Sequence, residues 1–171
     1  MSAPLIVTER LALRAMVAGD FPAYRDMMAS DRARFMGGPF TEAAAWGLFC
    51  HDHAGWSLFG LGALMIDKRR TGETIGQVGI NRGPLFPETE LGWTLYDGHE
   101  WHGYATEAAA GLRDWALAEG RLTTLVSYTH PGNHASQAVA RRLGAVIDPD
   151  APRQDPEDVV FRHPIAAEAA A

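Results

Sequence analysis

The sequence predicts an α/β (α+β) fold, in which a mixed, mostly antiparallel central sheet is flanked by helices. Three observations support this fold class. Apolar residues alternate at Leu91, Trp93 and Leu95, which is the two-residue period of a half-buried strand. Charged residues and a glycine at 67–72 separate two strand-like runs, which indicates a hairpin. A strand, a helix and a strand follow one another from 88 to 128, so the sheet also needs a parallel crossover.

The N-terminal half is expected to supply a strand, two helices and the hairpin. Asp20 and Thr41 precede helical runs of apolar residues, and their side chains can accept free backbone amides, so both are predicted N-caps. The predicted elements are a strand at 5–13, helices at 20–29 and 41–49, and strands at 56–66 and 74–81.

The C-terminal half is expected to alternate strands with helices. Gly120 and Gly144 stand where a helix needs a left-handed closing residue. The tail at 165–171 is low in complexity, and we assign it no function. The predicted elements are strands at 88–95 and 122–128, a helix from 105 to Gly120, a helix ending at Leu143, and strands at 145–147 and 159–162.

Length and composition predict one domain over residues 1–171, because 171 residues with 47% apolar content suit one buried core. Lys plus Arg number 15 and Asp plus Glu 21, so the net charge of −6 argues against a nucleic-acid partner and is compatible with a cationic substrate. Cys50 is the single cysteine, and neither a signal peptide nor a membrane-spanning run is visible. A cytoplasmic protein without a membrane partner is expected.

The loop from Tyr96 to Gly103 leads from a strand into a helix and predicts an anion site. The first turn of a helix has amides without internal partners and the positive end of the helix dipole. Gly103 would let a phosphate approach the backbone closely. The alternative is an ordinary strand-to-helix connection in which the glycines only make the turn.

Several segments together resemble the GNAT acetyltransferase superfamily, in particular the branch that includes the ribosomal-protein N-terminal acetyltransferases. The resemblance covers nearly the full length, and its motifs occur in the family's order. These motifs are Thr8-Glu-Arg-Leu-Ala-Leu-Arg14, Ile75-Gly-Gln-Val-Gly79, Glu90-Leu-Gly-Trp93, Gly103-Tyr-Ala-Thr-Glu-Ala108, Pro131-Gly-Asn133 with Ser136 and Arg142-Leu-Gly144, and Val159-Val-Phe-Arg-His-Pro164.

The resemblance implies a GNAT acyl-CoA N-acyltransferase fold and transfer of an acetyl group from acetyl-CoA to an amine. It implies that main-chain groups of Thr94 and Leu95 contact the pantetheine arm. It also implies that Asn133 contacts this arm, besides acting as an N-cap. Arg142 is expected to complement the C-terminal end of its helix, with contact to a CoA phosphate as the alternative. The pyrophosphate would be held by the loop residues Trp101, His102, Gly103, Tyr104, Ala105 and Thr106.

The loop departs from the family at two positions. Glu100 stands where the family often has Gln or Arg, and Trp101 stands near a family glycine. A carboxylate that points at the pyrophosphate would weaken binding by like-charge repulsion, whereas one turned to solvent would be largely screened.

Three residues are candidates for the chemistry. Glu90 is the first candidate for a general base, with a solvated strand-edge residue as its alternative. His130 is a second candidate, because its ordinary pKa lies near neutrality, although many histidines at such positions are structural. Many superfamily members use a tyrosine as the acid, but Ala140 occupies that position. The hydroxyl of Ser136, which matches the serine of this branch, is the expected proton donor to sulfur.

The acceptor stays open among a protein N-terminus, an amino acid and a small polyamine or antibiotic amine. The oligomeric state is also open, with a homodimer as one option. His51-Asp-His53 is interpreted as a solvated helix end rather than a metal pair, so no metal is predicted. The alternative to an enzyme is a non-catalytic acyl-CoA-binding or sensing module.

Overall fold

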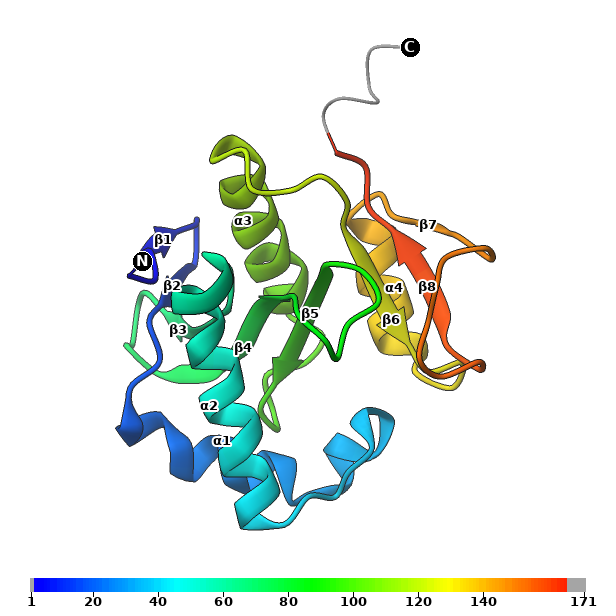
Figure 1. Cartoon of the computed structure of the whole chain (residues 1–171). Coiled ribbons are helices and arrows are strands. Elements are labelled where there is room, and N and C mark those ends of the chain that lie inside the picture. Colours follow the sequence, from blue (N-terminus) through cyan, green and yellow to red (C-terminus); the bar gives the residue numbers. More distant parts are fainter. Residues whose placement is uncertain (1, 166–171) are drawn as a thin grey trace.

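The computed structural model of the chain describes residues 2–165, and its strands form one eight-stranded sheet. The strand order is β1-β2-β3-β4-β5-β6-β8-β7, and the pairing is antiparallel except between β5 and β6 (Figure 1). The helices of the described part are all too short or too polar to cross a membrane.

The elements, in chain order, are β1 (Ile6–Val7), β2 (Leu11–Arg14), a 3-10 turn (Ala18–Asp20), α1 (Phe21–Met28), a second 3-10 turn (Asp31–Met36), α2 (Glu42–Phe59), β3 (Ala63–Lys68), β4 (Thr74–Asn81), β5 (Glu90–Leu95), α3 (Tyr104–Ala118), β6 (Val126–Thr129), α4 (His134–Arg142), β7 (Val146–Ile147) and β8 (Val159–Arg162).

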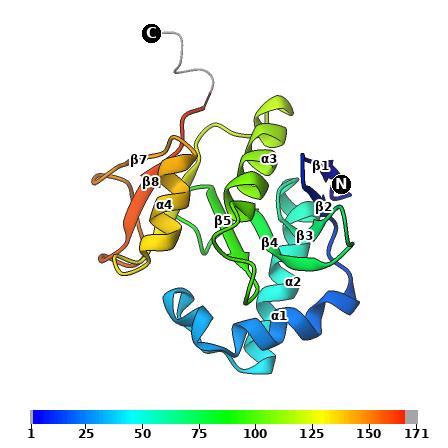
Figure 2. The same cartoon turned by 180° about the vertical axis from the view of Figure 1, so that it is seen from behind.

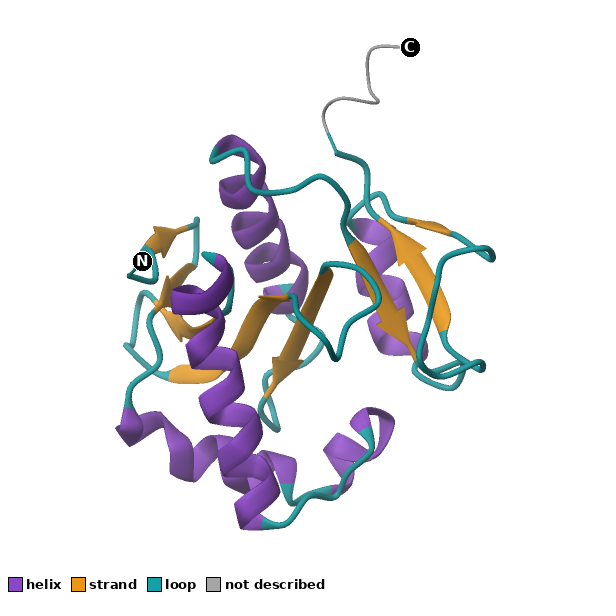
Figure 3. Cartoon of the chain, viewed as in Figure 1, coloured by secondary structure: helices purple, strands orange, loops and turns teal. Residues whose placement is uncertain are grey.

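Helices cover both faces of the sheet. On one face, Phe49 of α2 packs with Tyr24 of α1 and Met65 of β3. On the other face, Leu112 of α3 packs with apolar residues of β2 to β5, among them Leu91. Figure 1 shows α1 and α2 in front of the sheet, and the reverse view in Figure 2 brings α3 and α4 forward. Figure 3 shows the same layers by type of secondary structure. The mixed sheet with helices on its faces confirms the predicted fold class.

The capping residues and glycines of the sequence predicted most helix ends correctly. Thr41 caps α2, since its hydroxyl accepts the Ala44 amide at 3.2 Å. Gly120 and Gly144, which follow α3 and α4, have φ of 63° and 81°, the left-handed region that glycine adopts readily.

The single strand predicted at 5–13 is wrong, because the chain turns back between β1 and β2. Thr8 makes this turn, with its amide bonded to the Leu11 carbonyl and its hydroxyl accepting the Leu11 amide. Glu107 of α3 holds the turn: it accepts from the Thr8 hydroxyl at 2.6 Å and from the Arg10 amide at 2.7 Å. This anchor ties the N-terminal strands to the start of α3.

Asp20 is not a side-chain cap of α1, contrary to the prediction. Its carboxylate instead accepts two hydrogen bonds from Arg14 of β2, at 2.7 and 2.8 Å, and a third from the Val17 amide. The ion pair with Arg14 is mostly buried. A charged hydrogen bond to a fixed guanidinium replaced the capping contact here.

Helix α2 is longer than predicted and includes residues that were assigned to a strand and to a helix end. Trp56 lies on its buried side and donates to the Ala63 carbonyl at 2.8 Å, so β3 begins only at Ala63. His51-Asp-His53 lies within the helix, and Asp52 faces the sheet, where the Gln77 amide donates to it at 3.1 Å. The interpretation as a solvated helix end is therefore wrong for Asp52.

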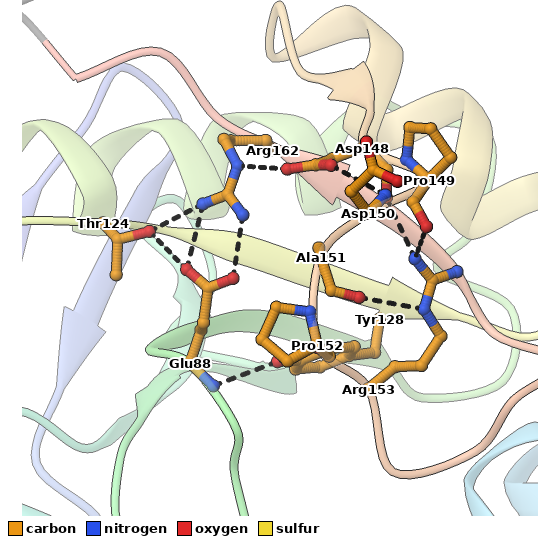
Figure 4. A network of polar contacts seen from close by, with 10 residues as sticks. All are labelled: Glu88, Thr124, Tyr128, Asp148, Pro149, Asp150, Ala151, Pro152, Arg153 and Arg162. Carbon is orange, nitrogen blue, oxygen red and sulfur yellow. Dashed lines mark hydrogen bonds and ion pairs between the residues drawn. The ribbon is translucent and has the colours of Figure 1, made fainter.

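Strands β5 and β6 are joined at one end, where Glu90 is the register partner of Val126. A polar network clamps this joined end (Figure 4). Arg162 of β8, the partner of Val126 on the other side, donates to Glu88 just before β5 and to Thr124 just before β6. The guanidinium thus fastens the starts of β5 and β6 together, and the two strands diverge beyond that point.

The tail prediction falls outside the described residues except for Ile165.

Candidate active site

The divergence of β5 from β6 leaves main-chain groups facing a gap. The Tyr96 amide donates to the Ile75 carbonyl at 2.8 Å, so alternate residues of β5 bond to β4 and the others point toward β6. Along the side toward β6, the Leu91 carbonyl accepts the Ser127 hydroxyl at 2.6 Å, and the Leu95 carbonyl accepts Arg32 at 2.8 Å. The main-chain groups of Trp93 lie between them and face the gap.

This register changes one sequence expectation. Main-chain contact with a cofactor was expected at Thr94 and Leu95, but Thr94 pairs with Gln77 of β4 and its main chain faces that strand. Its side chain points to the α2 face, where the hydroxyl lies 3.8 Å from the Met36 sulfur. The pair of residues whose backbone faces β6 is therefore Trp93 and Leu95.

The start of α3 has the geometry of an anion site. Gly103 is the N-cap residue, in the left-handed region with φ of 79°, and no side chain caps the helix. The first helical bond runs from the Glu107 amide to the Gly103 carbonyl at 3.0 Å, so the amides of Tyr104, Ala105 and Thr106 precede the helical ladder. Trp101 is 87% exposed and has a left-handed φ of 67°, which is unusual for a residue other than glycine.

The carboxylate of Glu100 forms an ion pair with Arg32 from the 3-10 turn (Asp31–Met36). Arg32, a residue of the α1–α2 connection, thus compensates the negative charge of Glu100, which the sequence places near the expected phosphate site. His102 is exposed, its Nδ1 lies 2.6 Å from the Glu100 carbonyl, and its ring stacks on Tyr104. It does not line the cavity described next, so its predicted contact with phosphate has no support from its position.

One cavity of about 1450 Å³ connects these features. It passes along the β5–β6 gap from the start of α3 to the α1–α2 connection. Except for His102, the predicted site residues all line it: Glu90, Thr94, Leu95, Trp101, Gly103, Tyr104, Ala105, Thr106, His130, Asn133, Ser136 and Arg142.

Glu90 sits on the floor of this cavity at the joined end of β5 and β6. The Asn81 amide of β4 donates to its carboxylate at 3.1 Å. Burial raises the pKa of Glu90 to about 7, and the nearby charge of Asp158 raises it too, although the hydrogen bonds oppose this. A carboxylate with a pKa near neutrality can take up and release a proton at physiological pH.

His130 is also at the cavity, but its ring is engaged. Its Nδ1 accepts the Gly132 amide at 3.0 Å, and the ring stacks on Phe35. The Nδ1 lone pair is therefore engaged by the main chain. The geometry favours Glu90 over His130 as a base.

The start of α4 forms the opposite wall. Asn133 caps the helix by accepting the Ser136 amide at 3.2 Å, as predicted. Ser136 lies in the first turn and lines the cavity, whereas Ala140 is fully buried in a core cluster with Phe161. Arg142 is exposed at the cavity rim and makes no ion pair within residues 2–165, so its charge is available to an anion.

Sequence reasoning missed two features. Asp52 lines the cavity, and burial raises its pKa to about 7, with a contribution from the Glu90 charge. Ser127, which bonds to Leu91 at the divergence point, is also bonded to the buried His163 at 2.9 Å; burial lowers the pKa of His163 to about 4. The signal that could have revealed Asp52 is a helix that extends over 42–59 instead of ending at 49. No pattern in the sequence indicated that Ser127 contacts His163.

Among the described side chains, no group of three or more His, Cys, Asp or Glu residues is placed to hold a metal ion.

Comparison with solved structures finds the same fold in known acetyltransferases. A crystal structure of an acetyltransferase from Agrobacterium tumefaciens str. C58 is 60% identical, covers 96% of each chain and has a TM-score of 0.93. RimL, a ribosomal L7/L12 alpha-N-protein acetyltransferase solved in complex with coenzyme A, shares the fold, with 18% identity, a TM-score of 0.75 and coverage of 96% of this chain and 100% of RimL.

Sequence comparisons add a curated relative and a family. YkkB, an uncharacterized protein of Bacillus subtilis (strain 168), is 33% identical over 88 residues, and the match spans about half of each protein, 50% of this chain and 51% of YkkB. The model of the acetyltransferase (GNAT) domain matches residues 10–146. The match extends from the turn after β1 to β7 and includes the anion loop and the diverging strands, so this chain belongs to the GNAT acetyltransferase family.

Proposed function

We propose that the protein is a single-domain N-acetyltransferase that transfers the acetyl group of acetyl-CoA to a primary amine by direct attack in a ternary complex. The observation that carries the proposal is the position of Glu90. Its carboxylate lies in the same cavity as the free amides of α3 and the diverging backbone of β5.

The residues that line the cavity are suited to bind acetyl-CoA. The amides of Tyr104, Ala105 and Thr106 would hold the pyrophosphate, since the helix start offers hydrogen bonds and positive potential together. The backbone of Trp93 and the side chain of Asn133 would position the pantetheine arm. When bound, acetyl-CoA supplies an acetyl group activated as a thioester.

Glu90 would act as the general base. An ammonium has no lone pair, so the acceptor amine must lose a proton before or during its attack on the thioester carbon. Glu90 takes that proton, directly or through a water molecule. Its raised pKa suits this role, because a carboxylate of ordinary pKa is a weaker base at neutral pH.

Ser136 would assist the departing sulfur. As the carbon–sulfur bond breaks, the electron pair moves to sulfur, and a hydroxyl that donates a hydrogen bond stabilises the thiolate. The position of Ser136 in the first turn of α4, inside the cavity, supports this role. The buried Ala140 cannot replace it.

The test is release of free thiol from acetyl-CoA with a panel of amines and peptides, combined with intact-mass detection of the products. Cys50 is an exposed free thiol, so the assay is run on Cys50→Ser and repeated by mass on the native protein. We expect acceptor-dependent thiol release. Saturable CoA binding without release for any acceptor would instead favour a non-catalytic acyl-CoA-binding module.

A further inference from the structure

The part of the cavity floor formed by Gly79 and Gly92, here called the glycine shelf, lies between two carboxylates. In the ladder between β4 and β5, Gly79 is opposite Gly92, and the rows on either side of this glycine pair are Asn81 with Glu90 and Gln77 with Thr94. All six residues line the cavity. Rows two residues apart along a strand are separated by about 7 Å. The two glycines therefore leave the centre of the floor without side chains.

A carboxylate stands at each end of this glycine shelf. Glu90 lies at one end and is held by Asn81. Asp52 of α2 lies over the other end, where Gln77 donates to it at 3.1 Å. The ion pairs found within residues 2–165 involve neither acid.

Two other acids that line the cavity differ in this respect: Glu100 is paired with Arg32, and Glu107 with Arg10. Asp155 and Asp158, in the loop before β8, also line the cavity and make no ion pair within residues 2–165, but neither is hydrogen-bonded to the row of Gln77 and Thr94 at the other end of the shelf. The charge of Glu90 is close enough to disfavour the negative charge of Asp52. An enclosed carboxylate without a counter-ion is costly, and a bound cation removes that cost.

From this arrangement we propose that Asp52 is a specificity-determining residue, and that the acceptor is an aliphatic amine with a second positive charge. This inference rests on the proposed acetyl transfer. The reacting amine lies at Glu90, the carbon chain crosses Gly79 and Gly92, and the distant ammonium is bound by Asp52. A diamine matches two separated carboxylates, whereas the N-terminus of a peptide brings one ammonium and a peptide backbone.

The experiment compares diamines with monoamines of the same chain length. Putrescine and n-butylamine, and cadaverine and n-pentylamine, are assayed with acetyl-CoA above neutral pH, where both acids are ionised. We expect kcat/KM to be at least about tenfold higher for each diamine, as is typical of a charge-assisted contact in an enclosed site. Asp52→Asn should reduce the diamine-to-monoamine ratio of kcat/KM to near one, chiefly through a loss of kcat/KM for the diamines.

Two further variants separate this effect from a general loss of charge or fold. Asp114→Asn removes one negative charge from the exposed side of α3 and should preserve the ratio. Gly92→Ala adds a methyl group that would meet only the Asn81 amide, at 3.8 Å, so the fold should accept it while the shelf is obstructed. We expect it to raise KM for both kinds of amine.

Equal kcat/KM for diamines and monoamines in the wild type would overturn the inference, as would an equal loss for both in Asp52→Asn or a clear preference for peptides. Calorimetry of putrescine and n-butylamine with the CoA-bound protein tests it independently of catalysis. Tighter binding of putrescine that depends on Asp52, without any thiol release, would support the acceptor assignment and count against the proposed acetyl transfer. Equal affinities would reject the acceptor assignment whatever the turnover.

Discussion

The guanidinium of Arg32 donates a hydrogen bond of 2.8 Å to the carbonyl of Leu95, at the open end of the gap between β5 and β6. The same side chain is paired with Glu100 of the anion loop. Arg32 comes from the α1–α2 connection, which lines the same cavity. One residue thus joins this connection, the end of β5 and the loop before α3.

Removal of Arg32 should weaken binding of CoA through Glu100. In Arg32→Ala the carboxylate of Glu100 is left without its counter-ion near the pyrophosphate site, and we expect the Kd for CoA to rise about tenfold. Glu100→Gln should lower the Kd slightly, and in that background Arg32→Ala should have little effect. A double-mutant cycle by calorimetry measures the coupling; additive effects of the two substitutions would contradict this account.

The pH dependence should report the ionisation of Glu90. A base acts in its deprotonated form, so kcat/KM of the wild type should rise with pH through about 7, the raised pKa of this carboxyl. Glu90→Gln should lower kcat/KM by about 100-fold and abolish this part of the profile. The same acceptor is used for both proteins, so that its own ionisation contributes equally. An unchanged rise in the variant would exclude Glu90 as the titrating group.

Ser136→Ala should slow the chemical step without weakening the cofactor complex. The hydroxyl would act on the departing sulfur, so we expect kcat to fall by about tenfold while the Kd for CoA stays within about twofold. Ser136 donates its backbone amide to the side chain of Asn133 in the cap contact, and alanine retains that contact. Full wild-type turnover across the pH range would eliminate the acid role.

Asp52→Asn should stabilise the fold above neutral pH. The folded-state pKa of Asp52, about 7, lies above the ordinary value of 3.8, so between these values the folded protein holds a proton that the unfolded chain has released. The wild type therefore loses stability as pH rises from about 4 to 7. At pH 8 the variant should gain about 1–3 kcal/mol in free energy of unfolding.

Urea unfolding at pH 8 and near pH 4 measures this gain. The difference between variant and wild type should shrink at the lower pH, where Asp52 is protonated in the folded protein and the unfolded chain is close to its own pKa of 3.8. Asp114→Asn is the matched control, because its carboxylate is exposed, and it should change stability little at either pH. A gain of the same size at both pH values would show that ionisation of Asp52 is not its cause.

Part of the structure could be predicted from the sequence, because it depends on contacts between residues that are close in the chain. Thr41 and Asn133 cap helices through atoms three residues away, and Gly103, Gly120 and Gly144 adopt left-handed angles that other residues disfavour. These signals placed α3, α4 and the anion loop. The hairpin between β3 and β4 followed from its turn.

The sequence by itself therefore determined the fold class and the segment that carries the anion loop, since periodicity and turn chemistry act over a few residues. Only the tertiary structure decided which charges meet. Arg32 and Glu100 are 68 residues apart in the chain, and Asp52 became a cavity residue because α2 continues to Phe59 and packs on β4. Strand register decided that the backbone of Trp93, rather than that of Thr94, faces the gap. Such pairings depend on how whole elements pack, and no local pattern encodes them.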